Sequence, residues 1–110
     1  MSMIVHHAII VTGGHQEVRR AHEGAYEEFD PTVISSITQG VNDVYSFMVG
    51  PDGSKDGWGT SSRFDDARRE FLGWIRNQIP RLTCLVVTYG DDVAKPFVTS
   101  GYHEEVEDER

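Results

Sequence analysis

The stretch from Met3 to Val11 constrains the fold of this chain more than any other. It is apolar and rich in β-branched residues, and its apolar side chains fall on both alternating positions of an extended strand. A strand that is apolar on both faces belongs inside a sheet rather than at its edge. We therefore predict a central strand over Met3–Val11, ended by Thr12-Gly13-Gly14. The remaining elements must supply its neighbours and a cover for one face.

Two amphipathic helices and further strands follow from the spacing of apolar residues. The first helix is predicted over His15–Phe29, before Pro31, and the second begins at Ser62, where Ser-x-x-Asp matches a capping box and Pro80 closes the helix. The other predicted strands are Val33–Thr38, Val44–Val49, Leu82–Tyr89 and a short edge strand at Pro96–Ser100. A turn over residues 39–43 makes the second and third strands a hairpin. The order predicts an α+β, ferredoxin-like fold (βαββαβ), with two helices on one face of an antiparallel sheet and an extra C-terminal edge strand.

Length and charge restrict the class of protein. The 110 residues fit one domain, placed at residues 1–103 and followed by an acidic tail at 104–110 that we predict to be disordered. The net charge of −8 argues against direct nucleic-acid binding, which requires a basic face. The same charge suits solubility and a basic partner.

The sequence also indicates a compartment. We expect no association with a membrane, because no apolar run approaches the roughly 20 residues that span a bilayer. Residues 1–12 show no secretion signal. The single cysteine, Cys84, has apolar neighbours and is predicted to be a buried, unreactive thiol. One unpaired cysteine fits a reducing compartment, so we expect a cytoplasmic protein.

The loop Pro51–Gly59 allows three interpretations. Asp52, Ser54 and Asp56 follow the spacing of a calcium loop, but its twelfth position is Arg63, where a bidentate glutamate is required. The loop is equally consistent with two ordinary turns. It could also be a contact surface for a partner, built from Trp58, Lys55, Asp56 and Arg63, with Trp58 either packed on the domain or exposed as a binding hot spot.

No catalytic constellation or cofactor motif appears, so we expect no cofactor. His6 and His7 point to opposite faces of one strand and cannot share a metal. His15 and His22 lie about two helical turns apart. Gly13 and Gly14 join a strand to a helix start, where backbone N–H groups can bind an anion. An alternative hypothesis is therefore a small-molecule or nucleotide binder (sponge-like) that uses Gly13, Gly14, His7, His15 and arginines.

Three runs of the sequence resemble short proteins encoded by bacteriophages and prophages. They are His6–Thr12, Phe47–Trp58 and Arg68–Trp74, and they occur in the same order along most of the chain. The resemblance implies a small phage accessory protein without an established activity. Such proteins often bind host factors stoichiometrically, including defence systems.

Our first hypothesis is accordingly a non-enzymatic protein that binds a host protein in the host cytoplasm, as a host-takeover or anti-defence factor. The alternatives are the nucleotide binder and the calcium module. A homodimer is also expected, because ferredoxin-like domains of this size often pair through sheet edges or faces.

Overall fold

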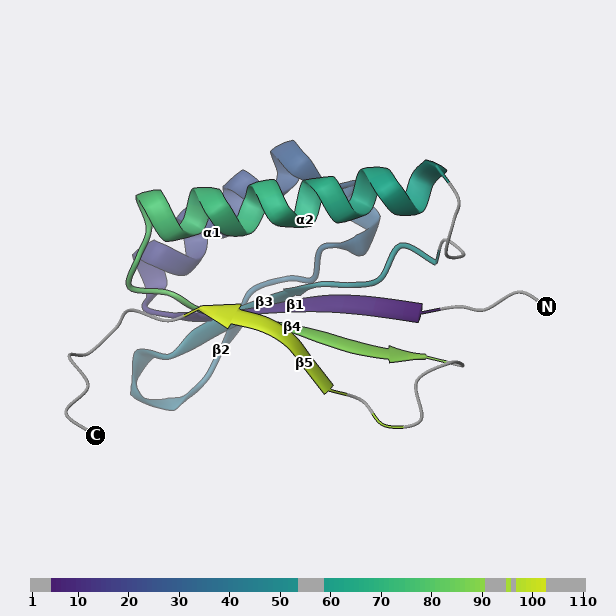
Figure 1. Cartoon of the computed structure of the whole chain (residues 1–110). Helices are drawn as coiled ribbons and strands as arrows, with labels where there is room; N and C mark the ends of the chain where they lie inside the picture. The colour runs from purple at the N-terminus through teal and green to yellow at the C-terminus, as the bar shows by residue number, and fades with distance from the viewer. Residues whose placement is uncertain (1–4, 54–58, 91–94, 96, 103–110) are drawn as a thin grey trace, which may run out of the picture.

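A computed structural model of the chain describes residues 5–53, 59–90, 95 and 97–102, which form five strands and two helices (Figure 1). The strands are β1 (Val5–Gly13), β2 (Thr38–Gln39), β3 (Tyr45–Val49), β4 (Thr83–Gly90) and β5 (Phe97–Tyr102). The helices are α1 (His15–Glu28) and α2 (Gly59–Gln78). Two short 3-10 turns lie at Pro31–Val33 and Val41–Asp43.

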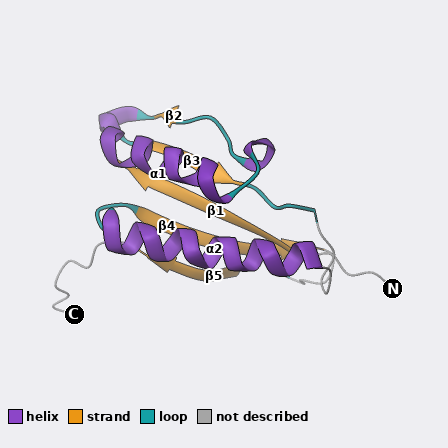
Figure 2. Ribbon diagram, turned by 90° about the horizontal axis from the view of Figure 1, so that it is seen from above, coloured by secondary structure: helices purple, strands orange, loops and turns teal. Residues whose placement is uncertain are grey.

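The five strands form one antiparallel sheet in the order β2-β3-β1-β4-β5. Both helices cover the same face, α1 above β1 and β3 and α2 above β4 and β5 (Figure 2). The predicted ferredoxin-like α+β fold is thus confirmed, with β1 at its centre. The predicted C-terminal strand is also confirmed as β5, at the edge beside β4.

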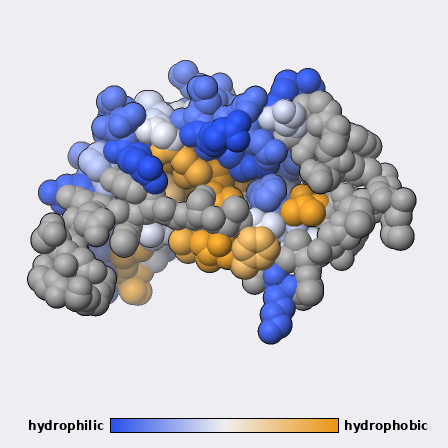
Figure 3. Space-filling model, viewed as in Figure 1, coloured by the Kyte–Doolittle hydropathy of each residue, from blue (hydrophilic) through white to orange (hydrophobic). Residues whose placement is uncertain are grey.

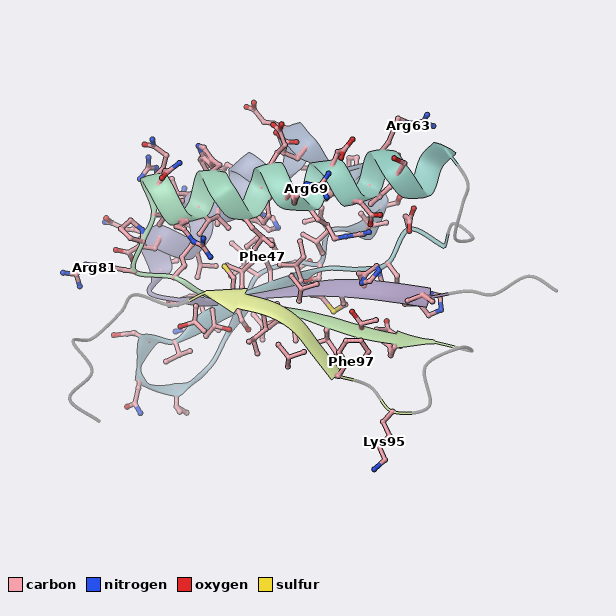
Figure 4. All side chains as sticks on the ribbon, in the orientation of Figure 1. Phe47, Arg63, Arg69, Arg81, Lys95 and Phe97 are labelled. Atoms are coloured by element: carbon pink, nitrogen blue, oxygen red, sulfur yellow. The ribbon has the colours of Figure 1, made fainter. Side chains whose placement is uncertain are left out.

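The core lies between the sheet and the helix layer. Ile9 and Val11 of β1 are fully buried there, because alternate strand residues point to the same face. Val18 of α1 and Phe71 of α2 are buried in the same core cluster. Phe47 of β3 lies in the same layer, between the sheet and the helices (Figure 4). The apolar stripes predicted for both helices are the faces that pack on the core.

The predicted strand at Val33–Thr38 is largely wrong. Asp30 accepts hydrogen bonds from the backbone N–H and the hydroxyl of Thr32, which holds a 3-10 turn at Pro31–Val33. Ser35 then donates its backbone N–H to the Met48 carbonyl, while its hydroxyl accepts from the Met48 N–H. Since the hydroxyl replaces a backbone acceptor, regular pairing is interrupted and only Thr38–Gln39 continues as β2.

The predicted start of the second helix is also wrong. Helix α2 already begins at Gly59, so Ser62 lies inside it rather than at its N-cap. Asp65 and Asp66 form ion pairs with Arg68 and Arg69, one helical turn onward, instead of compensating a helix terminus at Ser62.

The turn between β2 and β3 is confirmed where it was predicted. Asn42 and Asp43 both have positive φ, 59° and 58°, and the Val44 N–H bonds the Val41 carbonyl. Two central residues with positive φ are the mark of a type I′ turn, whose twist matches that of paired strands.

Candidate functional site

A groove runs along the seam where α1 and α2 lie side by side. Two adjoining cavities of about 410 and 300 Å³ open along it, and a third of about 230 Å³, lined by residues of α1 that include Arg19, adjoins the first. We call this feature the seam groove. Its lining includes Arg20, Glu23, Gly24, Glu27, Glu28, Asp30, Arg63, Phe64 and Trp74.

Trp74 is positioned by a close approach of the two helices at Gly24. A Cβ atom at Gly24 would lie 2.6 Å from two atoms of the Trp74 indole, so only glycine leaves the ring its place. The indole also stacks beside Phe71, with ring centroids 6.2 Å apart and an interplanar angle of 26°. The half-buried indole thus forms an aromatic wall of the groove.

Carboxylates surround this indole. Glu23, Glu27 and Glu28 all line the same cavity, and none of them pairs with a cation elsewhere in the described part of the chain. Glu23 and Glu27 are four residues apart on one helix, where like charges destabilise the helix slightly. Arg20, at the same cavity, donates instead to the backbone carbonyl of Gln78 at 3.2 Å. The Trp74 cavity is therefore lined by three carboxylates and one arginine, and none of these carboxylates forms an ion pair within the described residues.

The groove continues past the end of α1. Here Phe64 and Phe29 lie 6.0 Å apart between ring centroids, and Asp30 and Arg63 flank them. The pKa of Asp30 is lowered because its carboxylate accepts the Thr32 backbone N–H and hydroxyl hydrogen bonds. Asp30 therefore stays ionised near neutral pH and extends the acidic lining.

The predicted contact loop is described only in part. Ser54, Lys55, Asp56 and Trp58 lie outside the described residues, so their role as a partner surface or a calcium site stays a prediction. Asp52 is described and half-buried. The described residues contain no group of three or more metal-ligating side chains.

Arg63 of the predicted contact surface falls at one end of the seam groove. It is exposed on the first turns of α2, and its side chain points away from the body of the molecule (Figure 4).

The structure separates His7 from the other predicted anion-site residues, Gly13, Gly14 and His15. His7 and Gly13 lie six residues apart on β1, about 20 Å along the strand. The His7 ring bonds the Thr88 hydroxyl at 3.0 Å, at the opposite end of the strand from the glycines. His15 stacks on Tyr45 with a centroid distance of 4.5 Å.

The glycines themselves have packing neighbours. A Cβ atom at Gly13 would lie 2.7 Å from the buried Leu82 side chain, and one at Gly14 would lie 2.8 Å from a carboxylate oxygen of Glu17. The Glu17 carboxylate would repel an anion bound at this turn. Anion binding here remains a prediction that this geometry does not favour.

Sequence reasoning missed most of the seam groove. It named Trp74 only as the end of the run Arg68–Trp74 and did not connect it with Glu23, Glu27 or Gly24. The available signal was Gly24 itself, since an isolated glycine inside a helical pattern often marks a close packing contact. Which helix approaches it depends on tertiary structure.

The remaining observations limit other functions. Cys84 is fully buried, and burial raises the pKa of its thiol to about 12, so it is no nucleophile near neutral pH. No helix within the described residues is long and apolar enough to cross a membrane. Comparison with protein-family models, with curated proteins and with solved structures finds no match to this chain.

Proposed function

We propose that this protein acts without catalysis, as a small accessory protein that binds another protein along the seam groove. The observation that carries this proposal is the Trp74 indole, which shares its cavity with three carboxylates that form no ion pair within the described residues. The chemistry of the groove selects a basic segment. In keeping with the phage-like runs of the sequence, the partner we propose is a host protein in the cytoplasm of the infected cell, bound as a takeover or anti-defence target.

The groove offers a basic side chain two kinds of contact. A guanidinium or ammonium over the indole gains a cation–π interaction of about 0.5–2 kcal/mol. The same cation can meet Glu23, Glu27 or Glu28, and charge-assisted hydrogen bonds to these carboxylates are stronger than neutral ones.

The length of the groove suits a short peptide segment. Helix α1 has 14 residues, which span about 21 Å. An extended segment of about six residues covers that length. Arg63, at one end of the groove, would disfavour cations there, whereas Arg20 lines the Trp74 cavity itself and donates to the Gln78 carbonyl.

Calorimetry with an arginine hexapeptide tests the proposal. A glutamate hexapeptide, which carries the opposite charge, is the comparison. We expect the arginine peptide to bind and the glutamate peptide not to. Glu27→Gln should weaken binding about fivefold or more, because a charge-assisted contact is lost. Its melting temperature should hold or rise slightly, since the repulsion with Glu23 is relieved.

Asp66→Asn is the matched control, because Asp66 is an exposed carboxylate of α2 that lines none of the three cavities. It removes the same charge and should leave the affinity within about twofold. Equal losses in both variants would mean that the peptide senses only net charge, and the groove would not be the binding site. The host partner is then sought by capture from lysate, comparing wild type with Glu27→Gln.

A further inference from the structure

The face of the sheet opposite the helices is apolar and, among the described elements, uncovered. Figure 1 shows both helices on one side of the sheet only. Figure 3 shows hydrophilic residues over the helix layer and hydrophobic residues along the sheet below it. The sequence shows the same contrast. One quarter of the chain is charged, yet the five strands contain no Asp, Glu, Lys or Arg.

Strand register assembles the outward residues into one patch. Ile10 of β1 lies directly opposite Met48 of β3 and Leu85 of β4, so these three form a row across the sheet. They are 37%, 41% and 38% exposed, which is high for large apolar residues in central strands. We call this patch, with the neighbouring row described next, the open face.

A second row lies two residues along the same strands. Ala8 pairs with Val87, and Val87 pairs with Val98 of β5, which is 56% exposed. Because strand side chains alternate, Ala8 and Ile10 point to the same side of β1 and the two rows adjoin. Next to the rows, Thr12 pairs with Ser46 and Thr83, so hydroxyl groups border one end of the patch.

The size of the open face matches a specific interface of modest area. Four strands at about 4.8 Å spacing are roughly 20 Å across, and the rows with their borders extend about as far along the strands. The resulting area of roughly 400 Å² in projection is at the size where a patch on a monomer usually has a function. The solvent-accessible area of a rough face exceeds its projected area. Two such faces, with their polar borders, therefore bury on the order of 1,200 Å² of accessible surface, the lower limit of standard interfaces.

The open face is the surface on which a second copy of this chain can approach most closely, because its strands carry no Asp, Glu, Lys or Arg. Two molecules with a net charge of −8 repel each other, so close approach is least costly on a face that carries no charge. A basic partner protein would instead be attracted to acidic groups, which lie on the helices and loops. The chain's own copy is also always present to cover apolar surface that would otherwise promote aggregation.

We propose that the protein is a homodimer in which two open faces stack about a two-fold axis. Sheets packed in this way lie about 10 Å apart, with Ile10, Met48 and Leu85 of both copies between them. The helix layers then face outward, and both seam grooves remain accessible. This proposal is independent of the proposed function, because it uses the other side of the molecule.

Sedimentation equilibrium of the purified chain tests the dimer. We expect a mass twice the 12.4 kDa of one chain at micromolar concentration. Met48→Glu and Leu85→Lys should each convert the protein to a monomer, since each places a charge in the centre of a desolvated face. Both side chains are exposed in a single copy, so these variants should still fold, which circular dichroism can check.

Tyr26→Lys is the matched control. Tyr26 is an exposed aromatic residue of α1, 48% exposed on the helix layer, and the variant should stay dimeric. A wild-type protein that remains monomeric at about 100 µM would overturn the proposal, because a standard interface gives a far lower dissociation constant. So would a dimer that persists in both Met48→Glu and Leu85→Lys, since another surface would then form it.

Discussion

At the scale of single residues, Cys84 shows how position in the fold decides chemistry. The thiol points from β4 into the core opposite Val11, and burial raises its pKa to about 12 from its ordinary value of 9.0. An unfolded chain therefore releases this proton at lower pH than the folded protein. The contribution of the buried neutral thiol to stability is complete below about pH 9 and is lost as the pH rises from there toward 12.

This behaviour predicts a pH-dependent loss of stability. We expect the urea midpoint of the wild type to fall between about pH 8 and about pH 10.5, and to fall less in Cys84→Ala, which has no thiol to ionise. Thiol reagents at about pH 8 should label Cys84 only as fast as the protein opens. Rapid labelling of the native protein, or equal midpoint changes in the two variants, would contradict the buried thiol.

At the scale of elements, the packing of α1 on α2 depends on Gly24, whereas Gly73 of α2 has open space around it. This gives a matched pair of substitutions. Gly73→Ala should stabilise the protein by about 0.5–1 kcal/mol through helix propensity alone. Gly24→Ala gains the same propensity but displaces the Trp74 indole, an overpacking that costs about 1–3 kcal/mol.

Urea unfolding of the two variants measures the difference. We expect Gly24→Ala to be less stable than Gly73→Ala by about 2 kcal/mol, and to bind the arginine hexapeptide more weakly because the indole has moved. Equal stabilisation in both variants would show that the helices do not approach at Gly24 in solution.

The elements also show what the sequence could predict. Apolar, β-branched runs identified β1 and β4, alternation identified β3, and the helix stripes identified which face each helix buries. Val33–Thr38 has equal β propensity, but the Asp30 and Ser35 side chains bond the backbone there and compete with strand pairing. Local patterns do not reveal such competition, because Met48, the partner of Ser35, is remote in sequence.

The candidate site could likewise be predicted only in part. The sequence analysis selected Arg63 as a contact residue, and Arg63 lies at one end of the groove. It did not select Glu23 or Trp74, because they come close together only when α1 lies against α2. The open face was implied by the apolar outward positions of the Met3–Val11 strand. Its extent required the register of Ile10 with Met48 and Leu85.

At the scale of the whole molecule, the helix side and the sheet side differ in charge. Glu23, Glu27, Glu28 and Asp30 line the seam groove, whereas the strands of the open face contain no acidic residue. The two proposed interactions should therefore respond to salt in opposite directions. Raising NaCl from about 50 mM to about 500 mM shortens the screening length from roughly 14 Å to roughly 4 Å.

We expect this change to weaken binding of the arginine hexapeptide by about tenfold or more, because attraction to Glu23, Glu27 and Glu28 is screened. The same change should strengthen dimerisation, because repulsion between two chains of net charge −8 is screened while apolar contact is retained. Calorimetry and sedimentation equilibrium at both salt concentrations provide the measurement. A common direction for both would show that one surface serves both interactions.

The central place of β1 has a consequence for biosynthesis. This strand leaves the ribosome before the other four strands, yet its longest pairing is with β4, where Val5 meets Gly90. At about 5–20 residues per second, translation takes on the order of 4–15 s to pass from β1 to β4. Throughout that interval β1 lacks its longer partner, and only β3 is made early enough to pair with it. The nascent chain is therefore an expected client of ribosome-associated chaperones, and loss of only its last strands would leave the core of the sheet incomplete.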